Sequence, residues 1–220
     1  SDRDWAHWIA NELKALGHTP HVHEWEIAGG GDIYGWLRMK DGRVLFWIAD
    51  GTGHGAAAAL LTTLAKLLFQ HGSMDHNSPA SLMEGVDNDF RSIFGATSFM
   101  TARCVALDPG TGQAQVVGAG HPSLLVVHRD GTTESIASVA PPLGLIKRAA
   151  FSETTIDLEP GDAFLLYTDG LFRWTKDERH PMTPRQLEKA LDHSAPSAEV
   201  LLERIVAKTA PENSAKSAPD

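Results

Sequence analysis

An aspartate at the end of an apolar run is the first residue of this sequence whose position suggests chemistry. Asp50 directly follows VLFWIA, a run with the character of a buried strand. Three glycines and a histidine come immediately afterwards, namely Gly51, Gly53, His54 and Gly55. A buried carboxylate is costly unless it is paired, hydrogen-bonded or bound to a cation, so Asp50 needs a specific partner.

Two more aspartates share this setting beside glycine and at the end of an apolar strand. Asp169 ends AFLLYTD and precedes Gly170, while Asp32 follows Gly31 and opens another strand-like run. Clustered carboxylates suit Mg²⁺ and Mn²⁺, which prefer carboxylate, carbonyl and water oxygens. Neighbouring glycines let a backbone carbonyl turn inward and leave room for water. One Asp-Gly pair is usually a turn, but three such aspartates favour a metal site.

The histidines of the chain allow several interpretations. His54 could donate a proton to a leaving alkoxide or orient a water; equally, it could cap the next helix or hydrogen-bond its own loop. His121, in AGHPSL, is interpreted as a structural turn residue. His18, His21 and His23 lack the cysteine or acidic spacing of a zinc site and are expected to be exposed strand residues.

Composition narrows the class of protein. The 220 residues suit one large domain or two small ones, and the formal net charge of −9 argues against a nucleic-acid partner. No apolar stretch reaches about 18 residues, so no membrane partner is expected. The single cysteine, Cys104, lies in an apolar run and is predicted to be an inert buried thiol. This cysteine usage and the absence of a signal peptide predict a cytoplasmic location.

Turn signals and periodicity define the expected elements. Four strand pairs are predicted around Asp41-Gly42, Pro109–Gly112, Asp130-Gly131 and Pro160-Gly161. Apolar spacing predicts helices over residues 4–16, 54–72, 78–94, 184–193 and 197–208. The third helix should begin at Ser78-Pro79, an N-cap followed by proline at the first helical position. Strand pairs with short turns and interspersed helices predict an α+β fold with mostly antiparallel sheets.

Five segments occur in a recognisable order across residues 29–172: GGGDIYGW, IADGTGHGAAAALL, VGAGHPSLLVV, PPLGL and GDAFLLYTDGLF. Together they resemble the bacterial SpoIIE-like branch of the PPM-type, metal-dependent Ser/Thr protein phosphatases. The resemblance implies an α-β-β-α sandwich, in which two stacked antiparallel sheets are covered by helices. It also implies that residues 1–220 are one phosphatase domain, the C-terminal output domain of a longer regulatory chain.

The resemblance assigns roles to individual residues. Asp32 matches the acidic residue of the first glycine-rich motif, and Asp50 matches the aspartate that bridges two metals. Gly51 matches the glycine that lends its carbonyl, and Asp169 matches a ligand of the second metal. The final ligand of the family lies in an Asp-Asp motif that this sequence lacks, so Asp220, at the chain end, is expected to take its place.

The reaction implied by the resemblance is hydrolysis of phosphoserine or phosphothreonine on a protein. Two Mn²⁺ or Mg²⁺ ions would activate the attacking water, with Asp50, Asp169 and His54 as the catalytic residues. Bacterial members of this family act on phosphorylated STAS-type anti-anti-sigma regulators. They often follow a receiver or other sensory domain. The expected partners of this chain are therefore a STAS-type regulator as substrate and an upstream sensory or receiver domain.

Two departures support an alternative function. Gly35 and Arg173 replace acidic residues that are common in the family. We expect these two replacements to tune substrate choice. Together with the missing last motif, they favour a catalytically weak phosphatase-fold module that binds a regulatory partner. A nucleotide-binding enzyme is disfavoured, because GGGD and GTGHG match neither phosphate-binding glycine motif and lack a βαβ context.

Overall fold

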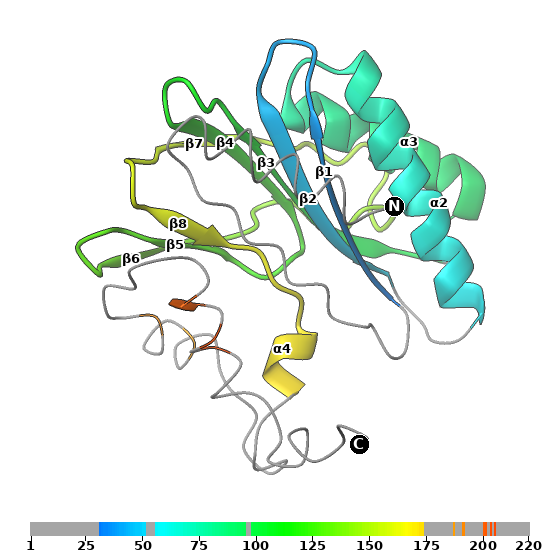
Figure 1. The fold of residues 1–220 in the computed structure, drawn as a ribbon. Coiled ribbons are helices and arrows are strands. Elements are labelled where there is room, and N and C mark those ends of the chain that lie inside the picture. The colour runs from blue at the N-terminus through cyan, green and yellow to red at the C-terminus, as the bar shows by residue number, and fades with distance from the viewer. Residues whose placement is uncertain are drawn as a thin grey trace, which may run out of the picture. The chain divides into compact units, whose positions relative to one another are not determined.

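The structure is a computed structural model that describes residues 31–51, 56–95 and 98–173, together with 187, 191, 200, 201, 203 and 205. The chain divides into two compact units (Figure 1). The five-stranded unit comprises Glu24–Ser123 and Ile136–Leu158. The three-stranded unit comprises Ser1–His23, Leu124–Ser135 and Glu159–Asp220.

The sheet of the five-stranded unit has the strand order β1-β2-β3-β4-β7, and every neighbouring pair is antiparallel. Its strands are β1 (Asp32–Arg38), β2 (Val44–Gly51), β3 (Met100–Leu107), β4 (Gln113–Ala119) and β7 (Thr154–Asp157). The hairpins predicted at Asp41-Gly42 and Pro109–Gly112 are confirmed, and Gly42 and Gly112 adopt φ values of 93° and 76° there. These left-handed conformations favour glycine over any other residue.

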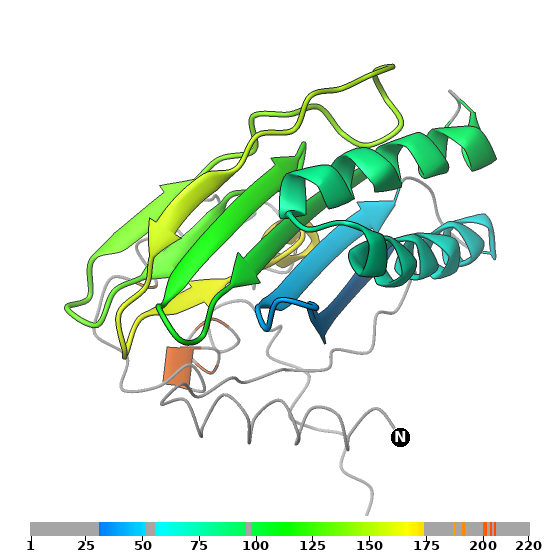
Figure 2. The same cartoon turned by 90° about the horizontal axis from the view of Figure 1, so that it is seen from above.

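Two helices, α2 (Ala56–Asp75) and α3 (Pro79–Phe94), cover one face of this sheet (Figure 2). The core lies between helices and sheet, where Trp47 of β2 stacks on Phe69 of α2 with ring centroids 4.8 Å apart. The end at Gly72 of the helix predicted over residues 54–72 is wrong, because α2 continues to Asp75. Gly72 instead lets α3 approach, since a Cβ there would lie 2.9 Å from Leu82 Cδ1.

The start of α3 confirms the prediction made from Ser78-Pro79. Ser78 is the N-cap and accepts a hydrogen bond from the backbone N–H of Ser81, whose hydroxyl lies near the Ser78 backbone N–H in return. Pro79 occupies the start of the helix, where its missing N–H costs nothing.

The sheet of the three-stranded unit has the order β6-β5-β8, formed by β5 (Leu124–Val127), β6 (Thr133–Ile136) and β8 (Ala163–Leu165). The short helix α4 (Gly170–Arg173) follows β8. Of the two helices predicted near the chain end, the described positions Leu187, Leu191, Leu201 and Ile205 are helical. Their side chains are buried in one cluster with Leu125, Val127 and Tyr167.

The strand pair predicted around Pro160-Gly161 is wrong. β7 pairs with β4, whereas β8 pairs with β5 in the other sheet. Leu158 N–H donates to Gly112 O over 2.9 Å, which fixes the end of β7 at the β3–β4 turn. The carboxylate of Asp162 accepts hydrogen bonds from Arg129 N–H (2.9 Å) and Glu159 N–H (3.1 Å), which joins the turn to the β5–β6 hairpin.

Asp162 also contacts His128 Nδ1 at 3.0 Å. Burial raises the pKa of Asp162, but its hydrogen bonds with Arg129, Glu159 and His128 outweigh burial and hold the pKa below its ordinary value. The ionised carboxylate is therefore the form that the folded turn stabilises.

The expected α+β class with two antiparallel sheets is confirmed. The helix predicted over residues 4–16 and the histidines His18, His21 and His23 lie outside the described residues. In the described part of the chain, no helix combines the length and the apolar character needed to cross a membrane.

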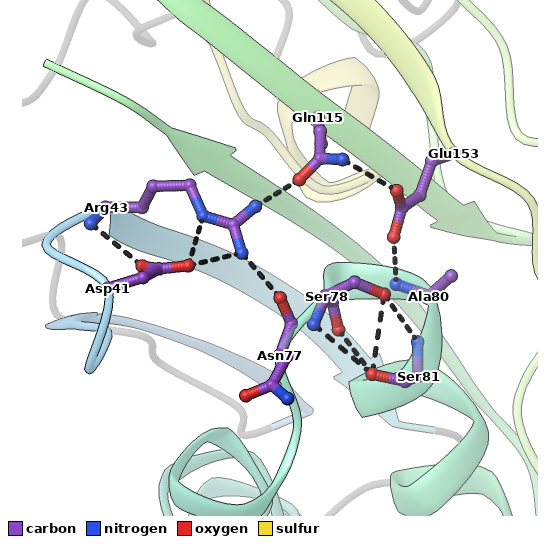
Figure 3. A network of polar contacts seen from close by, with 8 residues as sticks. All are labelled: Asp41, Arg43, Asn77, Ser78, Ala80, Ser81, Gln115 and Glu153. Carbon is purple, nitrogen blue, oxygen red and sulfur yellow. Dashed lines mark hydrogen bonds and ion pairs between the residues drawn. The ribbon is translucent and has the colours of Figure 1, made fainter. Parts of the chain in front are cut away.

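A polar network connects the β1–β2 turn to the loop before α3 (Figure 3). The Arg43 guanidinium lies 2.6 Å from Asp41 Oδ2 and donates to Asn77 O over 2.5 Å and to Gln115 Oε1. The hydrogen bond from Arg43 holds the pKa of Asp41 below its ordinary value. Arg43 thus links three segments that are distant in sequence.

Glu153 continues this network to the start of α3 (Figure 3). Its carboxylate accepts from Gln115 Nε2 (2.9 Å) and from the backbone N–H of Ala80 (3.0 Å). A carboxylate at a helix N-terminus satisfies an unpaired N–H and interacts favourably with the helix dipole.

Glu153→Ala should therefore lower the free energy of unfolding by roughly 1–2 kcal/mol, because it removes the acceptor of Ala80 N–H and of Gln115. Urea denaturation measures this loss, with Glu159→Ala as a matched change at an exposed glutamate. Equal losses in the two variants would contradict the stabilising role of Glu153.

Candidate metal centre

Asp32 and Asp50 lie directly opposite each other on β1 and β2. Both are on the sheet face turned away from α2 and α3, because the alternate residues Ile33, Trp47 and Ala49 pack into the helix-covered core. Opposite residues of an antiparallel pair have Cβ atoms about 4.5–5.5 Å apart, and like charges there are destabilising. A cation bound between them would offset this repulsion.

A backbone oxygen lies close to the Asp50 carboxylate at the end of β2. A Cβ added to Gly31 would lie 2.8 Å from Gly51 O and 2.9 Å from Asp50 Oδ1, so both oxygens converge beside Gly31. Gly51 N–H donates to Gly31 O over 2.9 Å, which fixes this close approach. Glycine is needed at position 31 because a side chain would fill the space in front of the oxygens.

Position 51 also requires glycine, for a reason of packing. Its Cβ would collide with Leu61 Cδ2 of α2, which packs against the helix-facing side of the strand end. Helix packing and the oxygen cluster therefore lie on opposite sides of one residue. Leu61 of α2 therefore supports the strand end from which Asp50 projects.

The chemistry of these donors fits a hard divalent cation. Two carboxylates and a carbonyl are the oxygen ligands that Mg²⁺ and Mn²⁺ prefer, although a complete shell needs further donors. The described residues contain no group of three or more His, Cys, Asp or Glu side chains that could hold a metal. Within this part of the chain, the oxygen cluster supplies only some of the donors that a divalent cation needs.

The other predicted site residues are less completely described. Asp169 belongs to the three-stranded unit, is exposed and directly precedes α4. His54 and Asp220 lie outside the described residues. Their assignments, like that of Asp169 as a ligand, stay predictions.

Thr101 was missed by the sequence analysis. It lies opposite Asp50 on β3, so Asp50 has Asp32 on one side and Thr101 on the other. Thr101 Oγ1 is 2.9 Å from Nδ1 of His121, which is buried. The sequence could have indicated Thr101, because the alternation of side chains along a strand places Thr101 and Arg103 on one face of an otherwise apolar run.

Comparison with known proteins identifies the family. The family described as "Stage II sporulation protein E (SpoIIE)" matches residues 40–220. The chain belongs to the SpoIIE family.

A curated relative of this SpoIIE-family domain is Phosphoserine phosphatase RsbP of Bacillus subtilis (strain 168). It is 30% identical over 167 residues, which cover 70% of this chain and 41% of RsbP. The chain therefore spans less than half the length of this relative.

Two solved structures share the fold of the domain. The RsbU and RsbW domains of Rv1364c from Mycobacterium tuberculosis match with TM-score 0.69 and 25% identity, covering 84% of this chain and 53% of that one. The SiaA-PP2C domain of Pseudomonas aeruginosa matches with TM-score 0.71 and 24% identity, covering 93% and 86%. The PP2C-type fold expected from the sequence is thereby confirmed.

Gly35, one of the two departures from the family pattern, has a packing explanation. It lies opposite Trp47, and a Cβ there would lie 2.6 Å from Trp47 Cε2 and 2.9 Å from Nε1. Position 35 alternates with Asp32 and faces the helix-covered core with Ile33 and Leu37. This geometry favours a packing role over the expected tuning of substrate choice. Arg173, the other departure, ends α4.

Cys104 confirms the prediction of an inert thiol. Its side chain is fully buried in the core between sheet and helices, and burial raises the pKa of the thiol far above its ordinary value. The neutral form is thus retained, and it is a poor nucleophile and metal ligand.

Gly31→Ala should weaken Mn²⁺ binding by at least about 10-fold, because its methyl group would fill the space beside Asp50 and Gly51 O. Isothermal titration with Mn²⁺ measures the affinity. Gly110→Ala, in an exposed turn, is the control for a general effect of the methyl group. Unchanged affinity in Gly31→Ala would mean that no cation binds at this oxygen cluster.

Asp50→Asn should stabilise the metal-free protein by up to about 1 kcal/mol, because it removes one of two like charges on neighbouring strands. The same variant should lose the rise in melting temperature that Mn²⁺ gives the wild type by binding the folded state. Thermal melts with chelator and with Mn²⁺ test both effects. Asp89→Asn, at an exposed position of α3, controls for the change in net charge. A less stable metal-free Asp50→Asn would contradict the proposed repulsion.

Proposed function

We propose that this SpoIIE-family domain is a metal-dependent phosphatase that hydrolyses phosphoserine or phosphothreonine on a protein. The observation that carries the proposal is the convergence of Asp50 Oδ1 and the Gly51 carbonyl beside Gly31, with Asp32 directly opposite Asp50. Two like charges on adjacent strands are retained at a cost to the free protein, which a bound cation would offset.

Asp32, Asp50 and Gly51 O would hold Mn²⁺ or Mg²⁺, and Asp169 and Asp220 are proposed as further ligands for a pair of ions. When bound, such ions supply the positive charge that activates a water and neutralises the phosphoryl oxygens. RsbX, a solved structure of the same fold with TM-score 0.65, is in complex with magnesium, which supports this ion class. His54 is proposed to donate a proton to the leaving alkoxide.

The proposed substrate is a phosphorylated STAS-type anti-anti-sigma regulator. The name Phosphoserine phosphatase for RsbP supports a phosphoserine substrate. In Rv1364c an RsbU domain and an RsbW domain were solved together, which supports a role in a regulatory system. Because RsbP is more than twice as long as the matched region, residues 1–220 are proposed to be one output domain linked to a sensory or receiver domain. We propose a cytoplasmic location for the whole protein.

The alternative is a phosphatase-fold module that binds a regulatory partner without turnover. The packing of Gly35 against Trp47 weakens it, since that departure no longer requires a lost catalytic function. A pure binding module would also have no reason to retain opposed carboxylates at a strand end.

Hydrolysis of a small aryl phosphate and of a phosphorylated STAS-type protein should require Mn²⁺ or Mg²⁺ and stop with excess chelator. Asp50→Asn should lower the rate by at least about 100-fold, because it removes the ligand proposed to be shared by both ions. Asp89→Asn should keep the wild-type rate. Full activity in excess chelator would disprove the metal-dependent mechanism, and metal binding without turnover would favour the alternative.

A further inference from the structure

A buried arginine organises the sheet next to the oxygen cluster. Arg103 lies on the same face of β3 as Thr101 and is only 1% exposed. Its Nε donates to Pro122 O over 2.9 Å, and one terminal nitrogen donates to Ser138 Oγ over 2.8 Å and, at 3.5 Å, to His121 O. A buried guanidinium is costly, so these bonds must repay its desolvation.

Gly118 leaves the space that this arginine occupies. It lies opposite Arg103 in the register of β3 and β4. A Cβ there would be 2.9 Å from the terminal nitrogen of Arg103 and would collide with Ser138 Oγ. The guanidinium is therefore enclosed by Gly118 of β4 on one side and by the backbone of residues 121–122 on the other.

The result is a rigidly held histidine. Ser138 Oγ donates to His121 O over 2.6 Å, so both Ser138 and Arg103 bind the backbone at this residue. His121 is 4% exposed, and its Nδ1 lies 2.9 Å from Thr101 Oγ1. The 120–122 segment is held further by the hydrogen bond from Gly120 N–H to Ala140 O over 2.9 Å.

Thr101 connects this network to the metal centre. Its hydroxyl donates to Asp50 O at 3.5 Å, which is long for a hydrogen bond, and its side chain is the cross-strand neighbour of the Asp50 carboxylate. A threonine hydroxyl has one hydrogen, so while it donates to Asp50 O, its bond with His121 takes the hydrogen from Nδ1. The two contacts of the Thr101 hydroxyl thus link His121 to the backbone of Asp50.

We propose that Thr101 and His121 are positioning residues for the metal centre, holding the end of β2 so that Asp50 and Gly51 O face the cation together. The inference rests on the proposed function, because it concerns the same site. Neither residue needs to touch the metal. Fixing a ligand through its neighbours is worth about 10–100-fold in metal affinity at other sites.

The test compares Mn²⁺ affinity and thermal stability in variants of Thr101. Thr101→Val keeps the shape but lacks the hydroxyl, and it should weaken Mn²⁺ binding by about 10-fold or more. Thr101→Ser keeps the hydroxyl and should restore most of that affinity. Thr155→Val, at an exposed position of β7, controls for the loss of a strand hydroxyl and should bind as the wild type does.

Variants of His121 test the other half of the network. His121→Asn places a hydrogen-bonding group near the position of Nδ1 and should retain more affinity than His121→Leu. Because Thr101 and His121 act through one hydrogen bond, Thr101→Val and His121→Leu together should cost little more than either alone. A merely structural role predicts lower melting temperatures with unchanged Mn²⁺ affinity, and this result would overturn the inference.

The outcome for the wild type separates this inference from the proposed function. Wild-type protein that binds no Mn²⁺ would overturn both. If the wild type binds Mn²⁺ and a folded Thr101→Val binds it as tightly as the Thr155→Val control, only the positioning role is overturned.

Discussion

The opposition of Asp32 and Asp50 across two neighbouring strands is the constraint on which the rest of this domain depends. A sheet tolerates two like charges at such a pair only where something compensates them. The surrounding residues are arranged to keep the oxygens converged rather than to separate them. Gly31 leaves space in front, and Leu61 of α2 supports the opposite side of Gly51.

The other motifs of the family act on the structure around this pair. Gly120, in AGHP, adopts φ 64° and contacts Pro142 so closely that a Cβ would lie 2.7 Å from its Cδ. Gly144, in PPLG, donates its N–H to buried Asp87 (2.7 Å) and accepts from Arg91 (2.6 Å), both on α3. Gly120 thus packs against the 140–142 loop, and Gly144 ties that loop to the helix layer. The glycines of these two motifs thus serve the packing of loops and helices.

Rigidity at the centre comes from packing on one side of the sheet and polar contacts on the other. Trp47, Phe69 and Gly35 form a close apolar contact beneath β2, which leaves no room for a side chain at position 35. On the opposite face, buried Arg103 holds the 121–122 loop through backbone carbonyls. A metal site needs such preorganisation, because ligands that must first be ordered bind a cation more weakly.

Local signals in the sequence determined the hairpin turns, the N-cap of α3, the buried state of Cys104 and the aspartates at strand ends, because each depends on neighbours within a few residues. The tertiary structure decided that β7 and β8 join different sheets, that α2 passes Gly72, and that Thr101 lies beside Asp50. Those features depend on contacts between segments distant in sequence. Turn chemistry marks where a strand ends, but the partner it pairs with is set by hydrogen bonds such as those of Leu158 and Asp162.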